Sequence, residues 1–139
     1  MNIRYSYPYY PYLKLRFTAR NQPRVYDIDA YIDTGFYDDE RRLLPGSEAS
    51  IPKKRVRLIV PLRFRDELGK PDFSESISLA DGREYESPAY YGGIKVNGET
   101  KPRPAVILCL GNGCLIGRHL IDEFKVFFDK GKVLTIEDC

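Results

Sequence analysis

The stretch Ala30-Tyr31-Ile32-Asp33-Thr34-Gly35 is where the pattern of this chain changes from strand to turn. Apolar and polar residues alternate from Tyr26 to Ile32, which predicts a half-buried strand that runs directly into Asp33. Gly35 then allows the backbone to turn sharply. Asp, Thr and Gly are all common turn residues, so this trio alone also fits an ordinary strand-ending turn.

A second stretch far downstream gives the first one a partner. It runs Cys114-Leu115-Ile116-Gly117-Arg118-His119-Leu120-Ile121, with two bulky apolar residues, a glycine and a helix-like segment. Together the two stretches resemble the retropepsin-like aspartic proteases (clan AA), the single-domain relatives of pepsin. The resemblance spans roughly residues 12–137, and its first motif is Asp-Thr-Gly-Phe. In that family the Asp-Thr-Gly loop carries the catalytic aspartate, and the apolar-apolar-Gly segment packs beside it.

The resemblance implies an aspartic endopeptidase that acts as a homodimer. Two facing carboxylates that share one proton can activate a water and protonate the leaving nitrogen of a peptide bond. This chain has one Asp-Thr-Gly and is too short for two lobes, so Asp33 of each subunit would meet on a two-fold axis. Thr34 would tie the two loops together, and Gly35 would keep the backbone close to the carboxylates.

The Asp81-Gly82 dipeptide lies between two β-like runs, which predicts a hairpin. In the family a mobile hairpin closes over the substrate, and the substrate lies against it as an extended strand. The resemblance therefore implies that Ala80, Asp81 and Gly82 bind a peptide or protein substrate. Leu115 and Ile116 would supply apolar surface on the opposite side of the cleft.

Three features depart from the family pattern, and one is the highly charged segment 38–42, where retroviral members have an apolar stretch. Phe36 stands where members often have Ala or Ser, although some bacterial and archaeal members do have Asp-Thr-Gly-Phe. The hairpin around Asp81-Gly82 is more polar than a glycine-rich retroviral flap. An alternative hypothesis is a catalytically silent retropepsin-fold module for dimerisation or peptide binding, because a fold does not fix a function.

The remaining pattern predicts an all-β fold. Hairpin signals recur, and the continuous apolar run 105–110 predicts a strand buried on both faces. A loop is expected over 66–72, a bend at 90–93, and a single helix over 117–124. These elements predict a small closed or partly closed acid-protease-like β-barrel with one short helix near the C-terminus. Further strands are expected around 13–17, 55–62 and 73–79, from 84 up to the bend, and around 94–96, 126–128 and 132–136.

The domain organisation is simple. Residues 1–11 are rich in Tyr and Pro, which predicts an N-terminal arm, and a loose tail is favoured over an arm that lies on a partner subunit. Residues 12–139 then form the retropepsin-like domain.

Composition narrows the classes of function. The chain has 139 residues, of which 42% are hydrophobic, and this fits one globular domain. The net charge of +2 predicts no nucleic-acid partner, and no apolar run is long enough to cross a bilayer. Three cysteines and the single His119 predict reduced thiols in a cytoplasmic protein, with no metal site and no cofactor. Cys114 as a protease nucleophile is disfavoured, because its surroundings are typical of a core.

Overall fold

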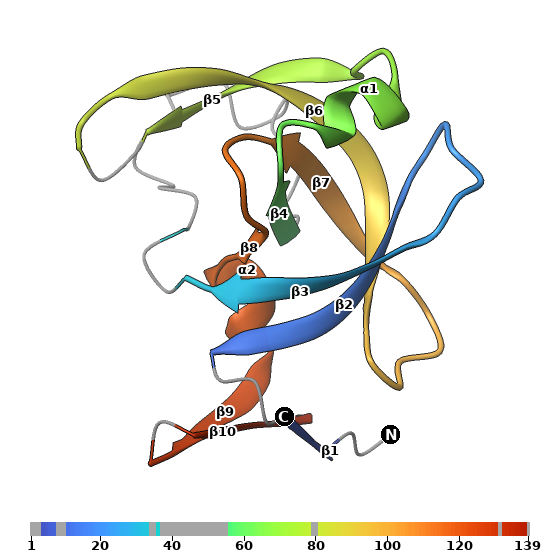
Figure 1. Cartoon of the computed structure of the whole chain (residues 1–139). Coiled ribbons are helices and arrows are strands. Elements are labelled where there is room, and N and C mark those ends of the chain that lie inside the picture. The colour runs from blue at the N-terminus through green and yellow to red at the C-terminus, as the bar shows by residue number, and fades with distance from the viewer. Residues whose placement is uncertain are drawn as a thin grey trace, which may run out of the picture.

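The structure is a computed structural model that describes residues 4–7, 11–33, 36, 56–78, 81–130 and 132–138 (Figure 1). Most of the described residues lie in strands, and two short helices join them. The elements in chain order are β1 (Arg4–Tyr7), β2 (Tyr12–Ala19), β3 (Tyr26–Ile32), β4 (Val56–Val60), α1 (Phe64–Leu68), β5 (Phe73–Ser78), β6 (Glu84–Val96), β7 (Arg103–Cys109), β8 (Leu115–Ile116), α2 (Arg118–Ile121), β9 (Phe124–Asp129) and β10 (Val133–Asp138).

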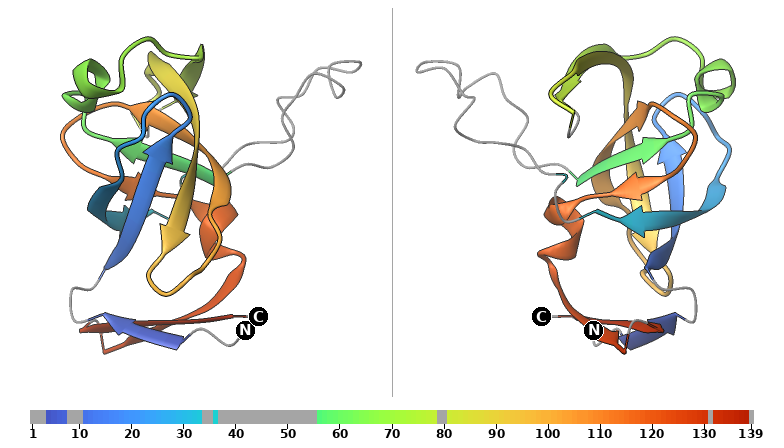
Figure 2. Two further views of the ribbon diagram at one scale, coloured as in Figure 1. Left: turned by 90° about the vertical axis from the view of Figure 1, so that its right-hand side faces the viewer. Right: turned by 60° about the vertical axis from the view of Figure 1, so that its left-hand side comes forward.

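Six strands form a closed barrel in the order β2-β3-β8-β4-β7-β6, and the pairing of β6 with β2 closes it. β5 continues the sheet beyond β6. A separate three-stranded sheet, in the order β1-β10-β9, lies at one end of the barrel (Figures 1 and 2). The predicted all-β barrel with a short helix near the C-terminus is therefore confirmed.

The barrel interior is filled by one face of each strand. On β2, the alternation predicted from the sequence turns Leu13, Leu15 and Phe17 inward, and each is at most 2% exposed. They pack in one cluster with residues from all five remaining strands of the barrel, including Ala30, Leu58, Ile94, Ile107 and Ile116. Each fully buried side chain of this size contributes roughly 1.5–3 kcal/mol, so this cluster is the main source of stability.

A second, smaller layer lies outside the barrel, where β5 folds back over β4 and β7. Ile77 of β5 belongs to a cluster with Ile59, Ala89, Val106 and Leu108 on the outer face of the barrel. Beside this cluster, the guanidinium of Arg57 donates to both carboxylate oxygens of Glu75 at 2.8–3.1 Å. The hairpin of β5 and β6 is thus attached to the barrel by an apolar cluster and an ion pair.

β6 is one unbroken strand of 13 residues that changes partners along its length. Its first half pairs with β5, and its second half pairs with β7 and β2. At the crossing with β2, a Cβ on Gly92 would lie 2.0 Å from the carbonyl oxygen of Thr18. The bend predicted at 90–93 is therefore a close strand crossing that closes the barrel, and only glycine fits at position 92.

Three local expectations differ from the structure. Residues 64–68 form α1 partly within the predicted loop, because Phe64 packs against the rings of Phe17 and Tyr26 while Leu68 is buried. The C-terminal helix is shorter than predicted, since β9 already begins at residue 124. Residues 4–7 of the expected loose tail pair with β10 as β1. Among the described residues, no helix has the length and apolar character needed to span a membrane.

Candidate active site

Asp33 lies where β3 ends beside β8. The two strands run parallel, with Tyr31 next to Leu115 and Ile32 next to Ile116. The ladder is continued by the backbone N–H of Asp33, which donates to the carbonyl of Ile116 at 3.0 Å. The two sequence stretches that were predicted to pack beside each other are therefore hydrogen-bonded neighbours.

The chain after Asp33 is also held by this second stretch. Phe36 donates its N–H to the Asp33 carbonyl at 3.2 Å, and the Phe36 carbonyl accepts from the N–H of Arg118 at 2.9 Å. Gly117 is buried between these bonds, and a Cβ there would lie 2.2 Å from the Phe36 oxygen. The glycine of the apolar-apolar-Gly segment is thus required by the close approach of the backbone that follows Asp33.

An apolar row crosses the outer face of the barrel next to Asp33. The strand registers place one residue from each strand side by side, in the order Tyr12, Tyr31, Leu115, Ile59, Leu108, Ala89 and Phe73. The far end of this row belongs to the second cluster, which contains Leu108 and Ala89 and against which Phe73 packs. Phe36 and Leu115 also contact this cluster. Asp33 follows Tyr31 by two positions, so strand alternation directs it to the same face.

The near end of the row is open. Tyr12 is 41% exposed and Tyr31 is 42% exposed, and their rings meet edge to face with centroids 5.7 Å apart. Neither tyrosine was predicted from the sequence to be a site residue. Tyr31 occupies a solvent-facing position in the alternation from 26 to 32, but a single exposed tyrosine in a strand is common, and its pairing with Tyr12 depends on the register of β2 and β3.

The other predicted site residues are distributed unevenly. Thr34, Gly35 and Ala80 lie outside the described residues. Leu115 is partly exposed on the outer face, beside Tyr31. The side chain of Ile116 is fully buried in the barrel, so this residue contacts the Asp33 turn through its carbonyl oxygen.

Asp81 and Gly82 form the tip of the hairpin between β5 and β6. The Asp81 carboxylate accepts the N–H of Arg83 at 2.9 Å, and Gly82 has a φ of +84°, so the predicted turn is present. Both residues are exposed. Figure 1 places this tip on the same side of the barrel as the C-terminal end of β3.

Cys114, the thiol that the sequence disfavours as a nucleophile, is partly buried, and Cys109 is buried within β7. Burial raises the pKa of Cys114, and it raises the pKa of Cys109 to about 11. A raised pKa keeps a thiol protonated at neutral pH, and the protonated form is a poor nucleophile. Within the described residues, no group of three or more His, Cys, Asp or Glu side chains is placed to hold a metal ion.

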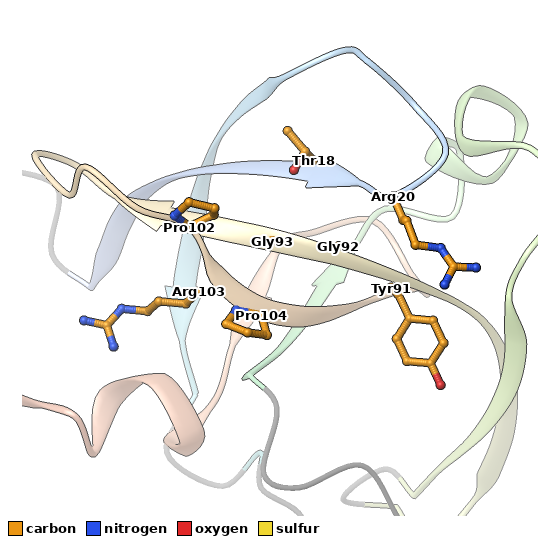
Figure 3. Close-up of a pocket in the computed structure, with 8 residues that line it drawn as sticks. All are labelled: Thr18, Arg20, Tyr91, Gly92, Gly93, Pro102, Arg103 and Pro104. Atoms are coloured by element: carbon orange, nitrogen blue, oxygen red, sulfur yellow. The ribbon is translucent and has the colours of Figure 1, made fainter.

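A hollow of about 480 Å³ lies away from Asp33, over the backbone of Gly92 and Gly93 (Figure 3). Arg20 and Arg103 line it, but both guanidiniums are already engaged by carboxylates, Arg20 by Asp72 at 3.0 Å and Arg103 by Glu99 at 2.7 Å. Pro102, Pro104, Thr18 and Tyr91 complete the lining. The hollow contains no residue selected from the sequence and presents no unsatisfied charge.

Comparison with known proteins gives no relative for this chain. No protein-family model matches it, and neither a curated protein nor a solved structure does. The inference of function therefore depends on the geometry around Asp33.

Proposed function

We propose that this protein is an aspartic endopeptidase that acts as a homodimer. Asp33 of each subunit would supply one carboxylate, and the pair would activate a water for attack on a peptide bond. The charged carboxylate would take a proton from the water, and the protonated one would donate to the leaving nitrogen. The active dimer must hold one shared proton, so we expect a mildly acidic optimum for cleavage.

One observation carries the proposal: the backbone of Asp33 is bonded to the Leu115–Ile116 strand, and Gly117 is packed against Phe36. These bonds hold the backbone of Asp33 and of Phe36 against the second stretch. A carboxylate at a rigid strand end, next to an apolar row, is suited to hold a water against an extended peptide.

The proposal is tested by cleavage of a fluorogenic peptide library at acidic and neutral pH. Asp33→Asn should lower cleavage about a thousandfold, because it removes the acid–base pair. Asp29→Asn, at an exposed position on the same strand, is the matched control and should retain activity. A statine-type inhibitor should block the wild-type protein. Normal cleavage by a folded Asp33→Asn variant would rule out this mechanism.

A second candidate is a peptide-binding module without turnover. The exposed Tyr12 and Tyr31 rings favour it, because an aromatic pair can bind a peptide whether or not cleavage follows. Mass spectrometry of peptides recovered after incubation separates the two candidates. Intact bound peptide favours the module, and cleaved products favour the protease.

A further inference from the structure

The three-stranded sheet at the end of the barrel has an open edge at β9. Within the described residues, β9 pairs with β10 on one side and with no strand on the other. Figures 1 and 2 show this sheet at one end of the barrel, and Leu134 and Ile136 of β10 belong to the barrel's buried cluster. The outer side of an edge strand is where another strand can add through backbone hydrogen bonds.

This edge also exposes two large aromatic side chains. Phe127 is 52% exposed and Phe128 is 47% exposed. The register with β10 places Phe127 opposite Thr135 and Phe128 opposite Leu134, so the two rings lie on opposite faces of the sheet. Charged side chains on an edge strand discourage unspecific pairing, and β9 carries Lys125 and Asp129 beside the exposed rings, so this edge selects a partner of complementary charge.

The charges along β9 are self-complementary. If a second β9 pairs in the antiparallel direction about Phe127, Lys125 lies opposite Asp129 of the partner subunit, and the two Phe127 residues face each other. The two-fold axis creates the Lys125–Asp129 contact twice. These three residues share one face of the strand, and within its own chain Lys125 is next to Glu137, so charge alternates across the extended row.

We propose that a second copy of this chain pairs with the edge of β9, antiparallel and centred on Phe127. The two three-stranded sheets would then join into one continuous sheet. The inference rests on the proposed function, which needs a homodimer, and names the surface that forms it. Along the chain, β9 follows the Leu115–Ile116 strand that binds the Asp33 backbone, with α2 between them.

The test is sedimentation velocity of the full chain with charge-reversed variants. Lys125→Glu and Asp129→Lys each place two like-charged pairs across the proposed axis, and each should raise the dimer dissociation constant about tenfold or more. An equal mixture of the two variants should restore the dimer, because every cross-strand pair is then attractive. Phe127→Ser should weaken the dimer to a similar extent, and Leu62→Ser, at a residue that is 50% exposed, is the matched control.

Weakening by each single variant with recovery on mixing supports the proposal, and recovery also shows that both variants fold. A wild-type protein that is monomeric at about 100 μM overturns it. So does a dimer that the variants leave unchanged, or one that they weaken without recovery on mixing. A dimer that passes these tests but cleaves no peptide would refute the proposed enzyme while leaving the β9 interface in place.

Discussion

Two glycines in this protein stand at close backbone crossings of nearly equal tightness, yet the crossings differ in what holds them. A Cβ on Gly92 would lie 2.0 Å from the Thr18 oxygen, and a Cβ on Gly117 would lie 2.2 Å from the Phe36 oxygen. Gly92 is in the middle of β6, which is paired on both sides with β2 and β7. Gly117 follows β8, a strand of two residues.

The Gly92 crossing therefore stabilises the barrel, whereas the Gly117 crossing positions the backbone next to Asp33. Long ladders hold the Gly92 crossing, and the closure of the barrel depends on it. The Gly117 crossing is held by a few hydrogen bonds, and what depends on it is the direction of the chain after Asp33. We therefore expect damage at Gly92 to be global and damage at Gly117 to be local.

Gly92→Ala should give the largest loss of stability. The added methyl group meets a backbone carbonyl that cannot rotate away, so the free energy of unfolding should fall by about 3 kcal/mol. Urea denaturation followed by circular dichroism measures this. Gly113→Ala is the matched control, since a Cβ there has no atom within 4 Å and should change stability little. A loss at position 92 as small as the control would mean that the barrel does not need the crossing.

Gly117→Ala should cost less stability, about 2 kcal/mol, because the short strand and the turn beside it can shift. Its effect on peptide cleavage should be much larger than its effect on folding, since Asp33 would be misplaced. The measurement is cleavage at a temperature where circular dichroism shows the variant fully folded. Full activity in that state would contradict a positioning role for Gly117.

The reactivities of Cys114 and Cys109 give a second comparison of the two crossings, with smaller expected effects. Cys114 is partly exposed and its carbonyl binds the N–H of Tyr31 near Asp33, whereas Cys109 is buried in β7. In a Cys139→Ser background, a disulfide reagent should label Cys114 first, and Cys109 only on unfolding. Gly117→Ala should accelerate labelling of Cys114 alone, and Gly92→Ala should accelerate both. Equal acceleration of both thiols by Gly117→Ala would remove the distinction.

The buried thiol of Cys109 should make the stability of the fold depend on pH. The pKa of Cys109 is about 11 in the folded chain and near its ordinary value of 9.0 when unfolded. Between these values the folded state holds a proton that the unfolded state releases, so stability should fall as pH rises from about 9 to about 11. Cys109→Ala should lose this part of the alkaline destabilisation.

The local pattern predicted most of what is local in the fold. The strand from 26 to 32 and the Asp81-Gly82 turn follow from alternation and turn chemistry, and both are present. The pairing of the Asp33 turn with the Leu115–Ile116 strand came from the family resemblance, because no local signal links segments so far apart in sequence.

The rest depended on contacts between distant segments. The sequence around Gly92 predicts only a bend. Glycine is required there because the carbonyl of Thr18, on another strand, lies against it. Residues 64–68 form too short a segment to show a helical period, and Phe64 packs against rings from β2 and β3. The strand at 4–7 has its partner at the opposite end of the chain, in β10.

The central claim, that each subunit carries half of a catalytic pair, is tested most directly by mixing wild-type chains with the Asp33→Asn variant. Equal amounts are unfolded together, refolded, and compared with the same total amount of wild-type protein in peptide cleavage. If one water needs Asp33 from both subunits, only wild-type homodimers are active, and the rate falls to about one quarter. A rate of about one half would mean that each subunit works alone, and it would contradict the shared site.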